Sequence, residues 1–183
     1  MSLRLHKEET SFLMIDVQER LLPSIHRREE VVQNAVRLMK VAEVLSLPVL
    51  YTEQYPKGIG STEASVLAAL PQGTRRFEKM TFSCCEEPDF LGIFEATMRP
   101  VTVVFGTETH ICVLSTTEDL LDRGRKIVIA ADACGSRTPD NYSLALATLR
   151  SCGALVLPTE TVVYQLLGRS GTPEFKAMLP LFK

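Results

Sequence analysis

The stretch "VTVVFGTETHICVLSTTEDLLDRG", residues 101–124, sets the expected fold. It begins with an apolar, β-branched run typical of a buried strand, passes through a polar corner, and continues as a helical pattern that stops at Gly124. Cys112 falls in the first turn of that helix, where backbone N–H groups and the helix dipole favour a negative charge. The stretch therefore predicts a strand and a helix with a thiol at their junction.

Strand and helix patterns alternate along the rest of the chain. Amphipathic segments at residues 28–46 and 138–153 predict helices, the second with Thr138 as N-cap and Gly153 at its end. Parallel strands need crossover helices that cover both faces of a sheet. We therefore expect one α/β domain over residues 1–183, a three-layer α/β/α sandwich around a six-stranded, mostly parallel sheet. The other five predicted strands are residues 11–17, 48–53, 75–79, 126–132 and 154–159.

The composition narrows the classes of partner. The chain has 183 residues, 45% of them hydrophobic, with 20 Lys+Arg against 22 Asp+Glu and a formal net charge of -2. This near balance gives no basic excess for nucleic acid or for an anionic membrane. The polar amino terminus and the absence of a long apolar run predict a cytoplasmic protein, and the five cysteines are expected to be reduced thiols. A small-molecule substrate is the expected partner.

Chemically active side chains follow several predicted strands. Ligands in such folds bind beyond the carboxyl ends of the strands, near the point where strand order reverses. Asp16, Glu53, Lys79 and Asp132 close four of the strands, and residues 107–112 follow another. Each of these carboxylates can equally be an ordinary strand-end residue that faces water or caps nearby N–H groups. Because these residues all follow the carboxyl ends of predicted parallel strands, that edge of the sheet is nevertheless the predicted position of the site.

A nucleophilic Cys112 needs a group that accepts its proton or stabilises its thiolate. His110 is two residues away on the same predicted helix and therefore points to a different side. Asp16 is a better candidate base, since the first and fourth strands are neighbours in the commonest doubly wound order. Lys79 can supply a cation beside both groups, while a pairing of Cys112 with His26 remains an alternative.

The motifs "LMIDVQ" (13–18), "FEKMTFS" (77–83) and "GTETHICV" (106–113), followed by "DLLDRGRKIVIAADACGSR" (119–137), resemble the isochorismatase-like cysteine hydrolases, which include nicotinamidases. The resemblance covers residues 10–170. The phrases "TEQYPKGIG" (52–60) and "LLDRG" (120–124) are most similar to the branch called isochorismatase domain-containing proteins. Most substrates of that branch are unassigned.

The resemblance implies a catalytic triad in which Cys112 is the nucleophile, Asp16 the general base and later acid, and Lys79 the cation that holds both anions. It also implies a cis peptide bond at Thr107–Glu108 and an oxyanion hole made by the backbone N–H groups of Glu108 and Cys112. The implied reaction is hydrolysis of a small amide through an acyl-thioester. The candidate substrate-binding residues are Gln18, Glu53, Tyr55, Phe82 and Thr107.

The sequence departs from the nicotinamidase pattern after the second strand. That family places an Asp-x-His metal site there, but this chain has Thr52, Glu53, Gln54 and Tyr55 and has no histidine between His26 and His110. We therefore expect neither a metal site nor a cofactor, and nicotinamide is not the expected substrate. The retained cysteine also argues against the vinyl-ether hydrolysis of isochorismatases, which use no thiol nucleophile.

Two alternatives remain open at this point. A non-catalytic protein that binds partners, or senses oxidants through Cys112, would need the same scaffold. The carboxyl-terminal residues Phe175, Met178, Leu179 and Phe182 have helical spacing, which suits either the domain's own core or a second subunit. Relatives commonly assemble, so the resemblance implies a homo-oligomer.

Overall fold

The computed structural model describes residues 4–182, and its centre is a sheet of six parallel strands. The spatial order is β3-β2-β1-β4-β5-β6, so the order reverses between β1 and β4. Every strand pair is parallel, which confirms the predicted α/β class and makes the sheet fully rather than mostly parallel within the described residues. The strands are β1 (Thr10–Ile15), β2 (Val49–Gln54), β3 (Arg75–Lys79), β4 (Val101–Thr107), β5 (Lys126–Gly135) and β6 (Leu155–Leu157).

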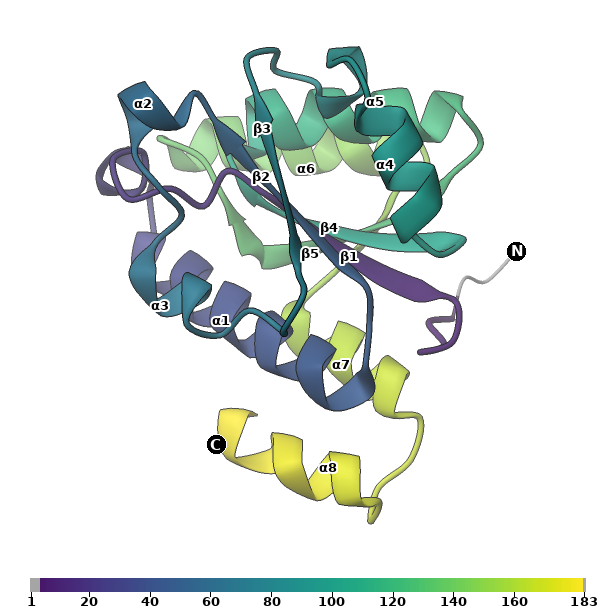
Figure 1. Cartoon of the computed structure of the whole chain (residues 1–183). Helices are drawn as coiled ribbons and strands as arrows, with labels where there is room; N and C mark the ends of the chain where they lie inside the picture. The colour runs from purple at the N-terminus through teal and green to yellow at the C-terminus, as the bar shows by residue number, and fades with distance from the viewer. Residues whose placement is uncertain (1–3, 183) are drawn as a thin grey trace.

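Helices cover both faces of this sheet (Figure 1). On one face lie α4, α5 and α6, and on the other lie α1 and α7, with α8 packed outside them (Figure 1). The α-helices are α1 (Arg28–Leu45), α2 (Pro56–Ile59), α3 (Ala64–Leu67), α4 (Phe90–Thr97), α5 (Leu114–Asp122), α6 (Pro139–Ser151), α7 (Thr159–Leu167) and α8 (Pro173–Met178). Short turns of other helix types are η1 (Leu22–Ser24), η2 (Cys84–Glu86), η3 (Thr109–Val113) and η4 (Leu179–Phe182).

The central strands are apolar because both of their faces are covered. Every residue of β1 and β4 is buried, as expected for strands in the middle of a parallel sheet. The rings of Phe12 and Phe105 meet edge to face with their centroids 6.0 Å apart, which joins the two strands at the centre of the core. The central strands can be apolar on both sides because helices cover both faces of the sheet, as the predicted alternation of strands and crossover helices requires.

The predicted helix signals are found in the structure. The apolar stripe of α1 is buried, with Val31, Leu38 and Leu45 among its core residues. Thr138 caps α6, since its side-chain oxygen accepts a hydrogen bond of 3.1 Å from the backbone N–H of Asn141. The first signal buries one face of α1 in the core, and the second fixes the residue at which α6 begins.

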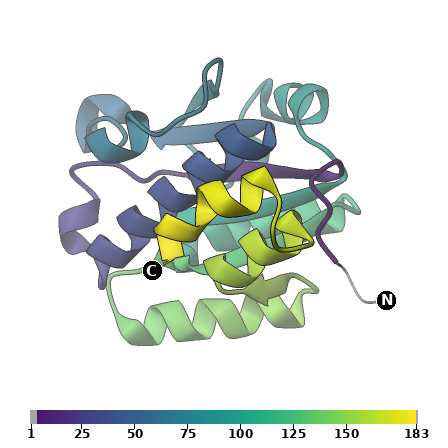
Figure 2. The ribbon, with the colours of Figure 1, turned by 90° about the horizontal axis from the view of Figure 1, so that it is seen from below.

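The carboxyl-terminal segment packs on the domain's own surface. Helix α8 runs across α1 and α7 (Figure 2), and Met178 is buried there. The guanidinium carbon of Arg37 on α1 lies 5.4 Å from the ring centroid of Phe182, and that ring also meets Tyr164 edge to face. The sequence left two roles open for this segment, covering the domain's own core or contacting a second subunit. The structure shows the first of these roles.

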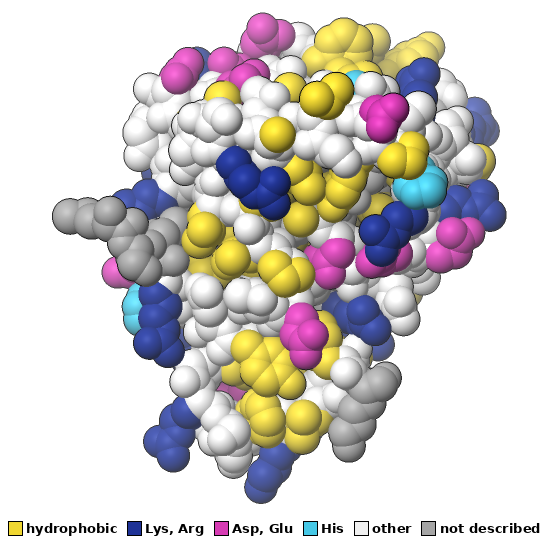
Figure 3. Space-filling view, turned by 180° about the vertical axis from the view of Figure 1, so that it is seen from behind, with side chains coloured by type: hydrophobic (Ala, Val, Ile, Leu, Met, Phe, Trp, Pro, Cys, Tyr) yellow, Lys and Arg dark blue, Asp and Glu magenta, His cyan; other side chains and the backbone are white. Residues whose placement is uncertain are grey.

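The length of the helices and the charge of the surface indicate whether a membrane or a nucleic acid could be a partner. No helix within residues 4–182 combines the length and the apolarity that a membrane crossing requires. On the face shown in Figure 3, side chains of both charge signs are interspersed with apolar ones rather than gathered into a basic field. This face therefore lacks the electrostatic footprint of a nucleic-acid-binding surface.

A glycine sets the path of β4 toward the site. Gly106 has φ +126, and a Cβ there would lie 1.9 Å from the carbonyl oxygen of Ile15 on β1. The register between β4 and β5 also shifts between Val104 and Gly106. Only glycine tolerates both the backbone conformation and the close approach. The next residues, Thr107 and Glu108, consequently leave the sheet beside the carboxyl end of β1.

Candidate active site

Asp16 follows β1 directly and is fully buried. Its backbone has φ 50, a left-handed conformation that Asp tolerates better than most residues. Its N–H donates a hydrogen bond of 3.2 Å to the carbonyl of Thr52 on the neighbouring strand β2. The Thr52 hydroxyl donates in turn to Asp16 Oδ1 at 2.6 Å. The strand order thus places and orients this carboxylate.

Lys79, the last residue of β3, extends its buried side chain to the same point. Its Nζ lies 2.7 Å from Asp16 Oδ2, and both side chains are inaccessible to solvent. Burial disfavours the charged form, but the negative charge of Asp16, together with the nearby sulfurs of Cys84 and Cys112, outweighs it, so the pKa of Lys79 is raised. The lysine therefore stays an ammonium ion and forms a buried ion pair with Asp16.

Cys112 lies in η3, the short π-helical turn that leads into α5, and is only 7% exposed. Burial raises the pKa of its thiol, the Asp16 carboxylate raises it further, and the Lys79 ammonium opposes them, leaving a value of about 12. The structure therefore brings the three predicted triad residues close enough for their charges to interact. It also indicates a thiol that rests protonated at neutral pH, not a preformed thiolate.

The turn between β4 and η3 holds the predicted oxyanion-hole residue. The peptide bond between Thr107 and Glu108 is cis. The Glu108 carboxylate is buried and forms a bidentate ion pair with Arg137: Nε lies 3.0 Å and 3.2 Å from the two carboxylate oxygens, and an outer guanidinium nitrogen lies 3.0 Å from Oε1. The guanidinium of Arg137 is therefore engaged in an ion pair with Glu108. The role of the Glu108 and Cys112 N–H groups stays a prediction.

His110 points away from the thiol, as its position in the turn indicates. Its Nδ1 lies 3.0 Å from Ser136 Oγ, and its Nε2 lies 3.3 Å from the side-chain nitrogen of Asn141 on α6. With the Asn141 amide as donor, Nε2 must be the acceptor and Nδ1 the N–H that meets Ser136. His110 therefore anchors η3 to α6, and neither of its ring nitrogens is left for Cys112.

Two of the candidate substrate-binding residues have structural partners instead. Gln18 is fully buried; its Nε2 donates to the carbonyls of Gln54 at 3.0 Å and Gly60 at 2.6 Å. Glu53 is 1% exposed, so the interpretation of a solvated strand end is wrong. Its Oε1 accepts from the N–H and the hydroxyl of Thr62 at 2.7 Å and 2.9 Å. Both side chains hold the loop after β2 in place.

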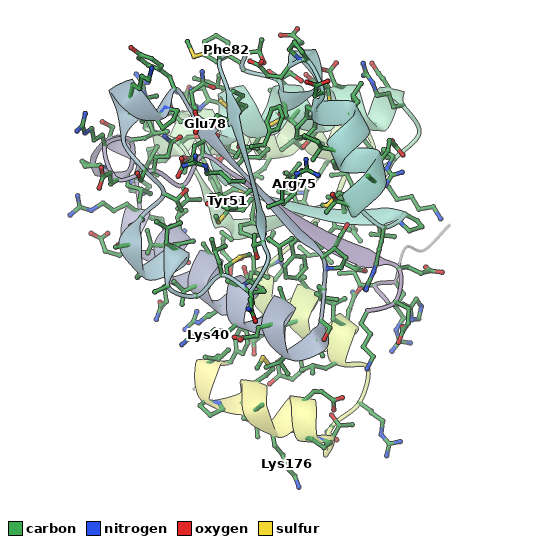
Figure 4. All side chains as sticks on the ribbon, in the orientation of Figure 1. Lys40, Tyr51, Arg75, Glu78, Phe82 and Lys176 are labelled. Atoms are coloured by element: carbon green, nitrogen blue, oxygen red, sulfur yellow. The ribbon has the colours of Figure 1, made fainter. Side chains whose placement is uncertain are left out.

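The other three candidates differ in position. The hydroxyl of Thr107 is buried and donates to the carbonyl of Asp16 at 2.6 Å, so this side chain also holds the chain rather than faces a ligand. Tyr55 is half-exposed and lines, with Lys79, a cavity of about 260 Å³. Phe82 is 62% exposed in the loop after β3, at the top of the molecule (Figure 4). Tyr55 and Phe82 alone remain placed to meet a ligand.

Two site residues were missed by the sequence reasoning. Thr52 and Gln54 both lie on β2, two positions apart, and therefore face the same side of the sheet. Thr52 binds Asp16, and Gln54 Oε1 accepts a hydrogen bond of 2.6 Å from Lys79 Nζ. The sequence signal that could have identified them is the period-two alternation of a strand, which places Thr52 and Gln54 on one face and Glu53 on the other.

The remaining cysteines form no disulfide. Cys84, Cys85 and Cys134 are buried, whereas Cys152 is exposed. Burial raises the pKa of Cys84 and of Cys134 to about 12. Cys152 is thus the accessible thiol against which any reaction at Cys112 must be distinguished.

The three triad side chains are buried, and the cavity that Lys79 lines is a small one. A cavity of about 980 Å³ lies between α1, α3 and η4, away from the triad. Within residues 4–182, no three His, Cys, Asp or Glu side chains converge in the arrangement of a metal site. At the β1–β4 reversal the structure brings together the Cys112 thiol, the Asp16 carboxylate and the Lys79 ammonium, with the buried Cys84 thiol nearby.

Known proteins share both the sequence and the fold of this chain. Residues 10–161 match the isochorismatase domain family. Mouse isochorismatase domain-containing protein 2A is 35% identical over 181 residues, which cover 98% of this chain and 85% of that protein. A solved structure named MAR1 ribonuclease, from Caenorhabditis elegans, is 32% identical with a TM-score of 0.92, over 98% of this chain and 92% of that one.

A more distant structure shares the fold alone. The Escherichia coli YcaC gene product, described as an octameric hydrolase of unknown specificity, has a TM-score of 0.92 at 19% identity, over 99% of this chain and 91% of that one. The family match spans most of the chain, including all three triad positions. Together with the 35% identity to the mouse protein, it shows that this chain belongs to the isochorismatase family of hydrolases.

Proposed function

We propose that this chain is a cysteine hydrolase that cleaves the C–N bond of a small amide through an acyl-thioester, with no metal or organic cofactor. The observation that carries the proposal is the convergence of three side chains from separate segments. Asp16 after β1 and Lys79 at the end of β3 form a buried pair at 2.7 Å, and both lie close enough to Cys112 to alter the pKa of its thiol. Membership of a hydrolase family supports the same reaction class.

The first step forms the acyl-thioester. Asp16 takes the proton of the Cys112 thiol as the sulfur attacks the carbonyl carbon, and the carbonyl electron pair moves onto oxygen. The backbone N–H groups of Glu108 and Cys112 hold this oxyanion, and each such donor is typically worth about 2.7–4 kcal/mol of barrier. The C–N bond then breaks, and protonated Asp16 transfers its proton to the departing amine.

The second step releases the acid. Water attacks the thioester carbonyl, Asp16 accepts a proton from that water, and the C–S bond breaks with return of a proton to sulfur. Lys79 stays an ammonium ion throughout and balances whichever of the two neighbouring groups is negative. The carboxylate is ionised before each attack and neutral after it, so the same residue acts as base and acid in turn.

The raised pKa of Cys112 favours this general-base scheme over a preformed thiolate. A thiol with a pKa of about 12 is almost wholly protonated at neutral pH and reacts little without a nearby base. The alternative of an oxidant sensor requires an accessible thiol of low pKa, whereas Cys112 is 7% exposed. Both observations weigh against sensing and toward catalysis that begins only when a substrate is in place.

Turnover of small amides tests the proposal. A panel of primary amides is incubated with the protein, and ammonia release is measured for wild type, Cys112→Ala and Cys134→Ala. Cys134 is a buried thiol outside the triad, so its variant controls for the loss of a sulfur atom. We expect turnover in wild type and in Cys134→Ala, and its loss in Cys112→Ala. Equal ammonia release by all three proteins would refute the role of Cys112.

The same panel includes single-stranded RNA, because one relative is named a ribonuclease. RNA cleavage that persists in Cys112→Ala, with no amide turnover by any protein, would replace the proposed activity. The near-neutral charge of the chain, a formal net charge of -2, argues against RNA as the substrate.

We also propose that the protein is a cytoplasmic homo-oligomer. Five cysteines outside any disulfide fit a reducing compartment. The E. coli protein of the same fold is described as octameric, which supports assembly of this chain as well. Light scattering after size-exclusion chromatography gives the mass, and a 20.3 kDa particle at every concentration would refute assembly.

A further inference from the structure

The ammonium group of Lys79 has two close partners, and only one of them is charged. Its Nζ lies 2.7 Å from Asp16 Oδ2 and 2.6 Å from Gln54 Oε1. The carbonyls of Thr81 and Phe82 are more distant, at 3.2 Å and 3.4 Å. An ammonium can donate three hydrogen bonds, and the two short contacts use two of its protons. Gln54 therefore supplies half of the short contacts that fix the position of the cation.

The amide of Gln54 is itself held in one orientation. Its Nε2 donates to the carbonyl of Met80 at 2.8 Å, which leaves Oε1 as the atom that faces Lys79. The reverse orientation would put the amide donor against the ammonium and leave the carbonyl of Met80 facing an oxygen. The backbone of Gln54 is fixed as well, since its N–H donates to Gln18 Oε1 at 2.7 Å and its carbonyl accepts from Gln18 Nε2 at 3.0 Å.

We infer that Gln54 is a positioning residue that holds the Lys79 ammonium between Asp16 and Cys112 through a neutral acceptor. This inference rests on the proposed function, and it assigns a role to the β2 side chain that is paired with Lys79 in the sheet. A neutral acceptor leaves the full positive charge to balance the single negative charge that moves between carboxylate and sulfur. A carboxylate at position 54 would neutralise the lysine and leave the thiolate without a counterion.

The alkylation rate of Cys112 tests this inference without a known substrate. The rate with iodoacetamide is followed by mass spectrometry of the Cys112 peptide between pH 7 and 9, in a Cys152→Ser background that removes the exposed thiol. Gln54→Glu has nearly the same size as the native residue but adds an anion beside the cation. A charge at this range shifts a pKa by about one unit, so we expect alkylation about tenfold slower at each pH. Gln33→Glu, on the exposed face of α1, makes the same change far from the site and is the matched control.

Gln54→Met guards against a result caused by altered packing. It removes the acceptor without adding charge, so we expect a rate between those of wild type and Gln54→Glu. A residue that only stabilises the loop would give the opposite sign, because loosening the structure exposes a thiol that is 7% exposed and speeds its alkylation. Thermal melts of each variant establish that the folded proteins are compared.

The outcomes separate this inference from the proposed function. A Gln54→Glu protein that folds and is alkylated as fast as wild type, or faster, overturns the positioning role. Alkylation rates of Cys112 that decrease in the order wild type, Gln54→Met, Gln54→Glu support it. Each variant is compared with wild type, so the test needs no substrate. The proposed function is judged separately by amide turnover in wild type and Cys112→Ala.

Discussion

The Asp16–Lys79 pair and the turn that carries Cys112 lie at the same edge of the sheet, but different contacts hold them. The pair is fixed by neighbouring strands, with Thr52 and Gln54 of β2 bound to the carboxylate and to the ammonium. All of these contacts are short, and the two charged side chains are inaccessible to solvent. Removing one member of the pair therefore leaves a buried group without compensation.

The turn of Cys112 is held from its outer side. His110 connects it to Ser136 and Asn141, and Glu108 connects it to Arg137, whose side chain is 61% exposed. Water competes for the exposed arginine, and the His110 contacts join neutral groups, so each of these contacts is weaker than the buried charged pair. The contrast indicates that the charged pair depends on strong, fixed contacts, whereas the nucleophile depends on several modest ones.

The largest expected effect is on turnover in Asp16→Asn. General acid–base catalysis typically contributes about 10²–10⁴-fold, so we expect hydrolysis to fall by that factor. Alkylation of Cys112 should change in the opposite direction. The Asp16 carboxylate raises the pKa of the thiol, so its removal lowers that pKa and increases the thiolate fraction at pH 8.

Parallel assays of the same Asp16→Asn preparation check this divergence. Ammonia release measures hydrolysis, and mass spectrometry of the Cys112 peptide measures alkylation. Turnover and alkylation that fall together would contradict the expected decrease in the Cys112 pKa and would indicate that Asp16 accepts the thiol proton during alkylation as well. Turnover equal to that of wild type would show that Asp16 is not the base. Asp140→Asn, on the exposed start of α6, is the matched control.

The next effect is on folding stability in Lys79→Met. This change leaves the fully buried Asp16 carboxylate without its cation, a loss that typically costs about 3–5 kcal/mol. The double variant Asp16→Asn/Lys79→Met removes both charges and should recover part of that loss. Urea titrations of the single and double variants give the free energies of unfolding. A single variant as stable as wild type would show that the pair contributes nothing to folding.

The alternation of strands and helices was predictable from local patterns, and the commonest doubly wound order correctly predicted that the first and fourth strands are neighbours. The apolar runs at residues 11–17 and 101–106 predict the central strands of the sheet. The strand order reverses between these two strands, so Asp16 and the turn before Cys112 are expected to meet at their carboxyl ends. The family resemblance then assigned roles to Asp16, Lys79 and Cys112. These residues lie where the elements end, so small errors in element bounds did not displace them.

The surroundings of the triad were less predictable because they depend on which way side chains face. Glu53 and Gln54 are adjacent polar residues at one strand end, yet Glu53 binds the loop at Thr62 while Gln54 binds Lys79. A one-residue difference exchanges the faces of a strand, and composition carries no information about that choice. The burial that raises the pKa of Cys112 likewise depends on the whole fold rather than on neighbours in sequence.

A smaller effect is expected for Arg137→Ala on the turn side. The buried Glu108 carboxylate loses its bidentate partner, but the exposure of the arginine limits the loss to about 1 kcal/mol. The double variant with Glu108→Gln should show a coupling of similar size in urea titrations. A coupling near zero would mean that solvent replaces the arginine without cost, and that the ion pair does not hold the turn.

The smallest effect is expected for His110→Ala. It removes two hydrogen bonds between neutral groups, to Ser136 and Asn141, each with a net contribution of about 1 kcal/mol or less. His110 lies two residues before the nucleophile, so a loosened turn misplaces the thiol. We therefore expect turnover to fall severalfold, while the free energy of unfolding falls by no more than the contribution of these two hydrogen bonds. His110→Gln keeps a side chain able to reach Ser136 and should restore part of the rate. If turnover in both variants equalled that of wild type, the nucleophile would need no anchor on α6, and the contrast between the two sides of the site would rest on Glu108 and Arg137 alone.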